Sequence, residues 1–255
     1  MQERSNMLYA EMLKIRRSHM WVVIIVLPLL AVVTGSLNYQ ANQGVLSHGW
    51  DSLFGQVLLF YSLFYFSMGV TIIVAASWRM EHQGSNFTML RTSTRRTVSL
   101  IAAKTASTLV LVGVMQVVLI VGTVGVGMVL VGSGAGMIGK YLFIAVLGVI
   151  VAIPLVLLQS VLSMYLTSFA APVAWSFLGI VIGTGLSLAP GVLGNLALVF
   201  PHSLVTRTLS IASITMGNDA AIKVGDIAQI LVATIVLAAA LMLVFVRIFN
   251  NRERS

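Results

Sequence analysis

Long apolar runs, separated by polar or glycine-rich segments, dominate the pattern of this chain. Six runs are close to or above the ~17 residues that a helix needs to cross the hydrocarbon core of a membrane. We therefore predict an all-α integral membrane protein whose six transmembrane helices fill residues 21–246. The predicted spans are residues 21–37, 53–76, 105–131, 140–162, 172–189 and 226–246.

Glycines inside two of these spans indicate where helices pack closely, because small residues let helix backbones approach each other in a membrane. The glycines concerned are Gly113, Gly122, Gly125 and Gly127 in the third span, and Gly179 and Gly183 in the fifth. The last two have the Gly-x-x-x-Gly spacing that is typical of such contacts.

The segment before the first span, residues 1–20, has an apolar stripe at helical spacing. Leu8, Met12 and Ile15 form this stripe. The basic residues near its end are Lys14, Arg16 and Arg17. This pattern predicts an amphipathic helix that lies in the membrane interface and contacts lipid. A solvated tail with some helix propensity is the alternative.

Residues 190–225 are too polar for a span and too apolar for an ordinary loop. Residues 193–200 could form a short apolar segment that enters the membrane without crossing it, and residues 204–214 could form an interfacial helix. Apolar runs of ~10–14 residues do not cross a bilayer, so we expect re-entrant or surface-lying pieces before the last span.

Composition agrees with a membrane protein. The chain is 58% hydrophobic and only 9% charged, whereas soluble domains carry roughly 25% charged residues. There is no cysteine, which excludes disulfides and thiolate metal sites. The net charge of +8 is better explained by basic loops at the cytoplasmic membrane surface than by nucleic acid. We therefore expect no nucleic-acid partner.

The distribution of basic residues predicts an orientation. Twelve of the fifteen Lys and Arg residues lie in the N-terminal segment, in residues 78–104 and in the tail at 247–255. The other three are Lys140, Arg207 and Lys223. By the positive-inside rule, both termini are expected in the cytoplasm, with the first span acting as a retained signal anchor.

Known catalytic patterns are missing from the sequence. Residues 134–140 have the glycine and lysine spacing of a phosphate-binding loop, but Tyr141 stands where a Ser or Thr would hold magnesium. The four histidines are far apart and form no metal-binding pair on a helix. No predicted span contains two acidic residues that could couple ion movement. We expect this chain to bind no cofactor or metal directly. We also expect the energy for its function to come from outside this chain.

Residues 78–104 are the candidate site for receiving that energy. This segment lies between the second and third spans and carries five basic residues. It also holds apolar residues such as Met80, Phe87, Met89 and Leu90, which a purely solvated linker does not need. These features predict a docking loop in which apolar side chains enter a groove on a partner protein. An ordinary basic linker is the alternative.

Three stretches carry a resemblance to a known family. They are E-M-L-K-I-R-R-S before the first span, W-R-M-E-H-Q-G-S-N-F with R-T-S-T-R-R-T-V-S-L-I-A-A-K after the second, and F-P-H-S-L-V at residues 200–205. Together with the length and layout of the chain, they resemble the ABC-2 type transporter permeases. The branch associated with lantibiotic immunity and bacteriocin export is the most similar.

The resemblance implies a six-helix subunit that dimerises and works with separate ATP-binding subunits, which bind ATP and magnesium. The loop after the second span would be the coupling element, in which Glu81, Gly84, Arg95 and Lys104 match the family's positions. The full set of expected coupling residues is Arg79, Met80, Glu81, His82, Gly84, Phe87, Leu90, Arg91, Arg95, Arg96 and Lys104.

The function expected from the resemblance is that of the permease in an ATP-driven exporter of a bacterial plasma membrane. Its cargo would be an antimicrobial peptide or an amphipathic drug-like molecule. Two alternatives remain open at this point. The chain could be a non-transporting sensor or assembly subunit, since no substrate site is visible, or a membrane-embedded enzyme, for which no catalytic group is visible.

Overall fold

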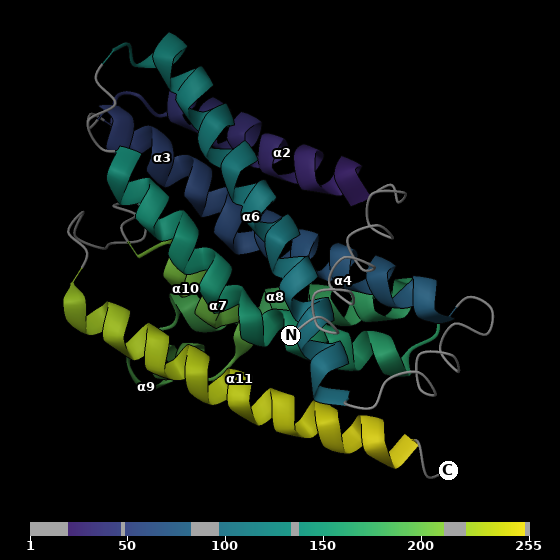
Figure 1. The fold of residues 1–255 in the computed structure, drawn as a ribbon. Helices are drawn as coiled ribbons and strands as arrows, with labels where there is room; N and C mark the ends of the chain where they lie inside the picture. The colour runs from purple at the N-terminus through teal and green to yellow at the C-terminus, as the bar shows by residue number, and fades with distance from the viewer. Residues whose placement is uncertain (1–19, 47–48, 83–96, 134–137, 212–222, 253–255) are drawn as a thin grey trace.

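The computed structural model describes residues 20–46, 49–82, 97–133, 138–211 and 223–252. In this part of the chain every regular element is a helix, and no strand occurs (Figure 1). The longer helices are α2 (Met20–Ala41), α3 (Gly49–Phe60), α4 (Phe66–His82), α6 (Thr97–Leu130), α7 (Ile138–Tyr165), α8 (Ala170–Leu188) and α11 (Val224–Arg252). The short ones are η1 (Tyr61–Tyr65), α9 (Gly191–Asn195), η2 (Leu196–Leu198) and α10 (Pro201–Leu209).

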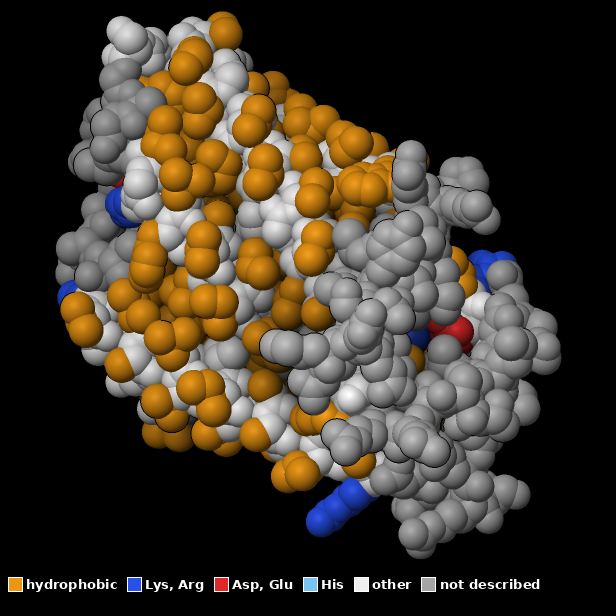
Figure 2. All heavy atoms as spheres, in the orientation of Figure 1, with side chains coloured by type: hydrophobic (Ala, Val, Ile, Leu, Met, Phe, Trp, Pro, Cys, Tyr) orange, Lys and Arg blue, Asp and Glu red, His pale blue; other side chains and the backbone are white. Residues whose placement is uncertain are grey.

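Six helices of the described chain are long and apolar enough to cross a membrane, with α3, η1 and α4 forming one continuous span. This confirms the prediction of an all-α, six-span, multi-pass membrane protein. Orange hydrophobic side chains cover much of the coloured part of the face seen in Figure 2, and blue Lys and Arg side chains are visible at few places on it. The predicted amphipathic helix, including Leu8, Met12, Lys14, Ile15, Arg16 and Arg17, lies outside the described residues.

The helices extend beyond the apolar runs that predicted them. The second span was expected at 53–76, but its helices run from Gly49 to His82. Asn38 of α2 lies beyond the predicted end of the first span at residue 37, and its Nδ2 donates a hydrogen bond to Gln56 Oε1 of α3. Polar residues can therefore continue a membrane helix when a neighbouring helix supplies their partner.

A π-helical segment interrupts the second span. In η1 the backbone N–H of Phe66 bonds to the carbonyl of Tyr61, five residues back. Wide turns of this kind leave carbonyl groups without their usual helical partner. Two hydroxyl groups satisfy such carbonyls here: Thr206 Oγ1 donates to Ser62 O at 3.0 Å, and Thr184 Oγ1 donates to Leu63 O at 3.3 Å.

Helix α10 is packed among the spans. It contacts α7 and α8 extensively and also touches η1 and α11. Eight of its nine residues are buried. The helix expected at 204–214 is observed at Pro201–Leu209 and is enclosed by other helices. Its hydroxyl-bearing side chains bond within the protein. The expectation that residues 190–225 form re-entrant or interfacial pieces stays a prediction.

The glycine prediction is confirmed at four positions and wrong at two. A Cβ atom at Gly179 would lie 2.6 Å from His202 Cε1, and one at Gly183 would lie 2.8 Å from His202 Cβ, so α10 sits directly against this face of α8. Gly122 and Gly127 of α6 similarly receive side chains from α2 and α3. Gly113 and Gly125 face open space, with no atom within 4 Å of a Cβ.

We expect Gly183→Leu to destabilise the protein by about 2 kcal/mol or more, because the new side chain would push α10 away from α8. Gly185→Leu is the matched control, since Gly185 also lies in α8 but nothing is within 4 Å of its Cβ position. Thermal unfolding in mild detergent compares the two. Equal stability of both variants would show that α10 does not depend on this close approach.

Candidate functional site

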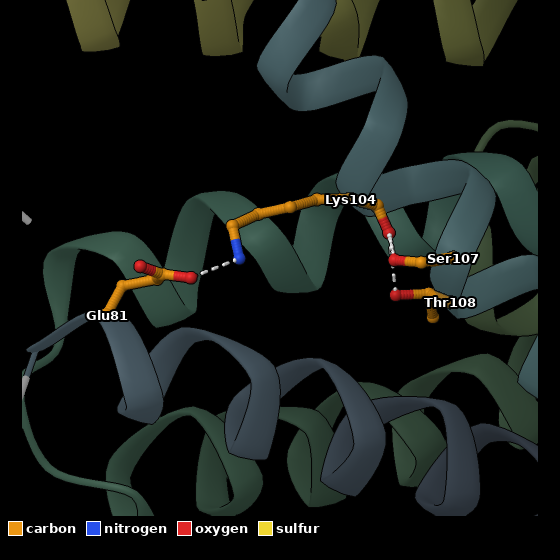
Figure 3. Close-up of polar contacts among 4 residues, drawn as sticks. All are labelled: Glu81, Lys104, Ser107 and Thr108. Atoms are coloured by element: carbon orange, nitrogen blue, oxygen red, sulfur yellow. Dashed lines mark hydrogen bonds and ion pairs between the residues drawn. The ribbon is translucent and has the colours of Figure 1, made fainter. Parts of the chain in front are cut away.

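A buried ion pair joins the two helices that flank residues 83–96. Glu81, in the last turn of α4, and Lys104, in the third turn of α6, approach within 2.9 Å between Oε1 and Nζ. Their side chains are only 1% and 3% exposed. Figure 3 shows the two side chains reaching toward each other across the gap between these helices. Such a pair holds two helix ends together only while both charges remain.

Neighbouring groups complete the surroundings of this pair. The Lys104 ammonium lies 5.1 Å from the centre of the Trp78 ring, within the range of a cation–π contact. The backbone carbonyl of Lys104 accepts hydrogen bonds from the hydroxyls of Ser107 and Thr108, at 2.9 and 3.0 Å (Figure 3). The charged residues are thus built into the interior of the helix bundle.

The end of α4 also contacts three other parts of the chain. Trp78 packs against Phe245 of α11, with ring centres 5.8 Å apart. His82 Nε2 donates a hydrogen bond to the Ser163 carbonyl of α7 at 2.8 Å. The guanidinium of Arg79 lies 5.7 Å from the centre of the Phe169 ring, directly before α8. The last five residues of α4 are therefore linked to α6, α7, α11 and the start of α8. We call these contacts the α4 junction.

The predicted docking loop at 78–104 is longer than the segment that separates the helices. Residues 78–82 belong to α4 and residues 97–104 belong to α6. The expectation that Glu81 and Lys104 lie in a solvent-facing loop is wrong, because they are buried against each other. Among the other expected coupling residues, Arg79 is exposed, while Met80 and His82 are partly buried.

The remaining expected coupling residues, Gly84, Phe87, Leu90, Arg91, Arg95 and Arg96, lie outside the described residues. Their role in binding a partner stays a prediction. The structure also identifies residues that connect the end of α4 to other helices. Two of them, Trp78 and Phe169, were not predicted as site residues from the sequence. No local sequence pattern identifies these two residues, because the groups they contact lie on other helices.

A second ion pair lies at the opposite end of the spans. Lys140 Nζ of α7 approaches Asp51 Oδ1 of α3 at 3.0 Å, and Tyr141 also donates its hydroxyl to Asp51. The Tyr141 ring stacks on Phe54 at 3.9 Å between centres. Lys140, which matched the lysine of a phosphate-binding loop by spacing, thus has a carboxylate partner within the protein.

Sequence reasoning missed a polar cluster around His202 of α10. The Nε2 atom of His202 lies 3.1 Å from Ser176 Oγ of α8 and 3.4 Å from Gln159 Nε2 of α7. Ser176 in turn bonds to Thr71 of α4. These four residues are far apart in sequence, so no local motif identifies them. Within the described residues, no group of three or more metal-binding side chains occurs.

Comparison with known proteins identifies the family. A sequence model of the ABC-2 family transporter proteins matches residues 7–183, more than half of the chain. This chain belongs to the ABC-2 transporter family. It is therefore a permease subunit of an ABC transporter, and membership of the ABC-2 family implies assembly with an ATP-binding subunit. No curated protein matches this permease closely.

The match also determines how the α4 junction of this ABC-2 permease is interpreted. The matched residues include the whole second span, residues 83–96 and all of α6 and α7. Apart from Phe245 of α11, the residues of the junction therefore lie in the matched part of the chain. An ABC-2 permease is a membrane transport component and is not itself catalytic.

We expect Glu81→Gln to lower the free energy of unfolding of this permease by about 3 kcal/mol or more, because it removes the negative charge that lies against the buried Lys104 ammonium. The double variant Glu81→Leu, Lys104→Met should recover most of this loss, since it removes both charges together. Thermal unfolding in mild detergent measures both. Additive losses in the double variant would contradict a coupled buried pair.

Proposed function

We propose that this permease is the membrane subunit of an ATP-driven exporter in a bacterial plasma membrane, with both termini in the cytoplasm. Its proposed cargo is an antimicrobial peptide of the lantibiotic or bacteriocin type, or an amphipathic drug-like molecule. ATP and magnesium would bind to a separate ATP-binding subunit. A second permease, either a copy of this chain or a related one, would complete the transmembrane part.

The α4 junction is the observation that carries this proposal. Residues 83–96 connect α4 to α6, and the Glu81–Lys104 pair joins the same two helices beside that connection. A force applied to residues 83–96 by a partner therefore acts on both helix ends together. Through His82 and Trp78 it also reaches α7 and α11. Contiguous packed contacts of this kind can transmit movement between sites.

The charge distribution supports the proposed orientation. The described basic residues near the α4 junction, Arg79 and Arg247, add to those of the N-terminal segment and residues 83–96. At the opposite end, Lys140 is balanced by Asp51 in an ion pair. The excess of unbalanced positive charge thus lies on the side of residues 83–96, which the positive-inside rule assigns to the cytoplasm.

We expect the tagged permease, purified in mild detergent from its native host, to bring along a stoichiometric ATP-binding subunit that mass spectrometry identifies. Phe87→Ala with Leu90→Ala should remove most of that subunit, because apolar anchors carry most of the binding energy at protein interfaces. Val45→Ala, at an exposed apolar residue outside the expected coupling set, is the control and should retain the subunit. A partner that stays bound to the double variant would contradict docking through these side chains.

Transport coupling is tested in the assembled complex. We expect Glu81→Gln to leave the ATP-binding subunit attached but to reduce the stimulation of ATP hydrolysis by a lantibiotic peptide about fivefold or more. Lys140→Met, which breaks the pair at the opposite end, is the matched control and should retain stimulation. All rates refer to the folded fraction, measured by size-exclusion chromatography.

Two outcomes would count against this mechanism. Full peptide stimulation in Glu81→Gln would show that the ion pair does not link ATP hydrolysis to the helices. Absence of any stimulation in the unmodified complex, with the ATP-binding subunit present, would favour a sensor or assembly subunit that does not transport.

A further inference from the structure

Arg207 is a cation without an anionic partner in the described part of the chain. It lies in the last turn of α10, and its side chain is partly buried. Its Nη1 atom donates a hydrogen bond to the backbone carbonyl of Gly194 at 3.1 Å. Of the three described acidic residues, Asp51 and Glu81 bind lysines and Asp226 forms no ion pair. A guanidinium at the edge of an apolar helix bundle is stabilised by an anion.

The rest of this guanidinium is open to a ligand. A guanidinium offers five N–H donors in a flat fork, and the hydrogen bond to Gly194 uses one of them. The Nε and Nη2 atoms of Arg207 have no hydrogen-bond partner in the described chain, and neither is among its fully buried polar atoms. They are therefore accessible at the surface. The fork matches the oxygens of a phosphate, which can accept two of these hydrogen bonds together.

The level of the guanidinium in the membrane follows from α8. That helix has 19 residues and is therefore about 28 Å long, close to the ~30 Å thickness of the hydrocarbon core. Its two ends are thus expected near the two membrane interfaces. The Cβ position of Gly194 lies directly against the carbonyl of Ala189, the residue after α8. Arg207, bonded to the Gly194 carbonyl, therefore reaches the interface where lipid phosphates lie.

Exposed apolar side chains lie on the segment that carries this carbonyl. None of the residues in α9 is buried. Val192, Leu196 and Val199 are 79%, 45% and 62% exposed, and their spacing of four and three places them on one side of a helical segment. In Figure 1, α9 lies toward the end of the bundle where α11 begins, away from the end of α4. The leaflet opposite the α4 junction therefore meets a row of apolar side chains beside one cation.

We propose that Arg207 binds the phosphate of an anionic phospholipid, such as phosphatidylglycerol, in the leaflet next to α9. The acyl chain of this lipid lies along Val192, Leu196 and Val199. An anionic headgroup is favoured over a zwitterionic one, because choline or ethanolamine would place a second cation near the guanidinium. Since Arg207 also binds the Gly194 carbonyl, the lipid, α9 and α10 are joined at one point.

Photolabelling of the full chain in nanodiscs of phosphatidylcholine tests this proposal. The probe is phosphatidylglycerol with an alkyl diazirine near the start of one acyl chain, and the comparison probe is phosphatidylcholine with the same acyl chains. Mass spectrometry locates the adducts on residues 191–199. At equal membrane fractions, we expect the anionic probe to label this segment about tenfold more than the zwitterionic one, as one charge-assisted hydrogen bond allows.

Three variants separate the contributions to binding. Arg207→Gln should make the two probes label equally, whereas Arg207→Lys should keep part of the preference, because it retains the charge but not the flat fork. Lys223→Gln is the matched control: Lys223 is exposed directly before α11, at the same end of the bundle, and its loss should leave the preference intact. If Arg207→Gln does not fold, high salt should reduce the preference in the unmodified chain by screening the accessible charge.

Several outcomes would overturn this inference. Equal labelling by both probes in the unmodified chain, or an unchanged preference in Arg207→Gln, would exclude a phosphate site at this residue. An equal loss of preference in Lys223→Gln would identify a general attraction of that surface for anions. Excess inorganic phosphate should leave the preference unchanged, and its removal of the preference would identify a site for a water-soluble anion instead. The experiment needs no ATP-binding subunit, so a failure of the proposed function leaves its result unaffected.

Discussion

Polar groups in the apolar interior of this permease depend on one another, because lipid offers them no hydrogen-bond partner. This constraint explains the most specific contacts in the structure. The carboxylate of Glu81 and the ammonium of Lys104 are buried together. The carbonyls of the π-helical segment are satisfied by threonine hydroxyls from α8 and α10. Each contact links two different helices.

The same constraint makes the end of α4 suited to transmitting movement. A buried charge cannot leave its partner without a large loss of stability, so α4 and α6 must move together at this end or separate through an unfavourable state. The additional contacts of His82 and Trp78 extend the connection to α7 and α11. A partner that moves residues 83–96 would therefore act on several linked helices together.

Helix α10 shows how a polar segment is accommodated among membrane spans. Gly179 and Gly183 leave room on α8 for His202, and the imidazole meets Ser176 and Gln159. Close packing and hydrogen bonding act together here, since the small residues bring the polar groups within reach. The pairing is incomplete in the described chain, because His202 Nδ1, Gln159 Oε1 and both amide atoms of Gln116 are buried without a hydrogen-bond partner.

The sequence by itself determined the class of the fold and the number of spans, because runs of apolar residues long enough to cross a bilayer have few other stable conformations. It also indicated the contact at Gly179 and Gly183. It misplaced the ends of that segment and the environment of Glu81 and Lys104, since hydropathy treats a charged residue as a sign of solvent. It placed a helix at 204–214, where the structure has a helix at Pro201–Leu209 that is enclosed by other helices.

Only the tertiary structure decided which polar residues meet. Glu81 and Lys104 are 23 positions apart, and Thr71 and Ser176 are 105 apart. The partner of a buried polar group is set by how helices pack, and no pattern along one helix records which residue faces it from the next. For the same reason the open space at Gly113 and the unpaired amide of Gln116 could not be read from the sequence, where Gly113 looked like another packing glycine.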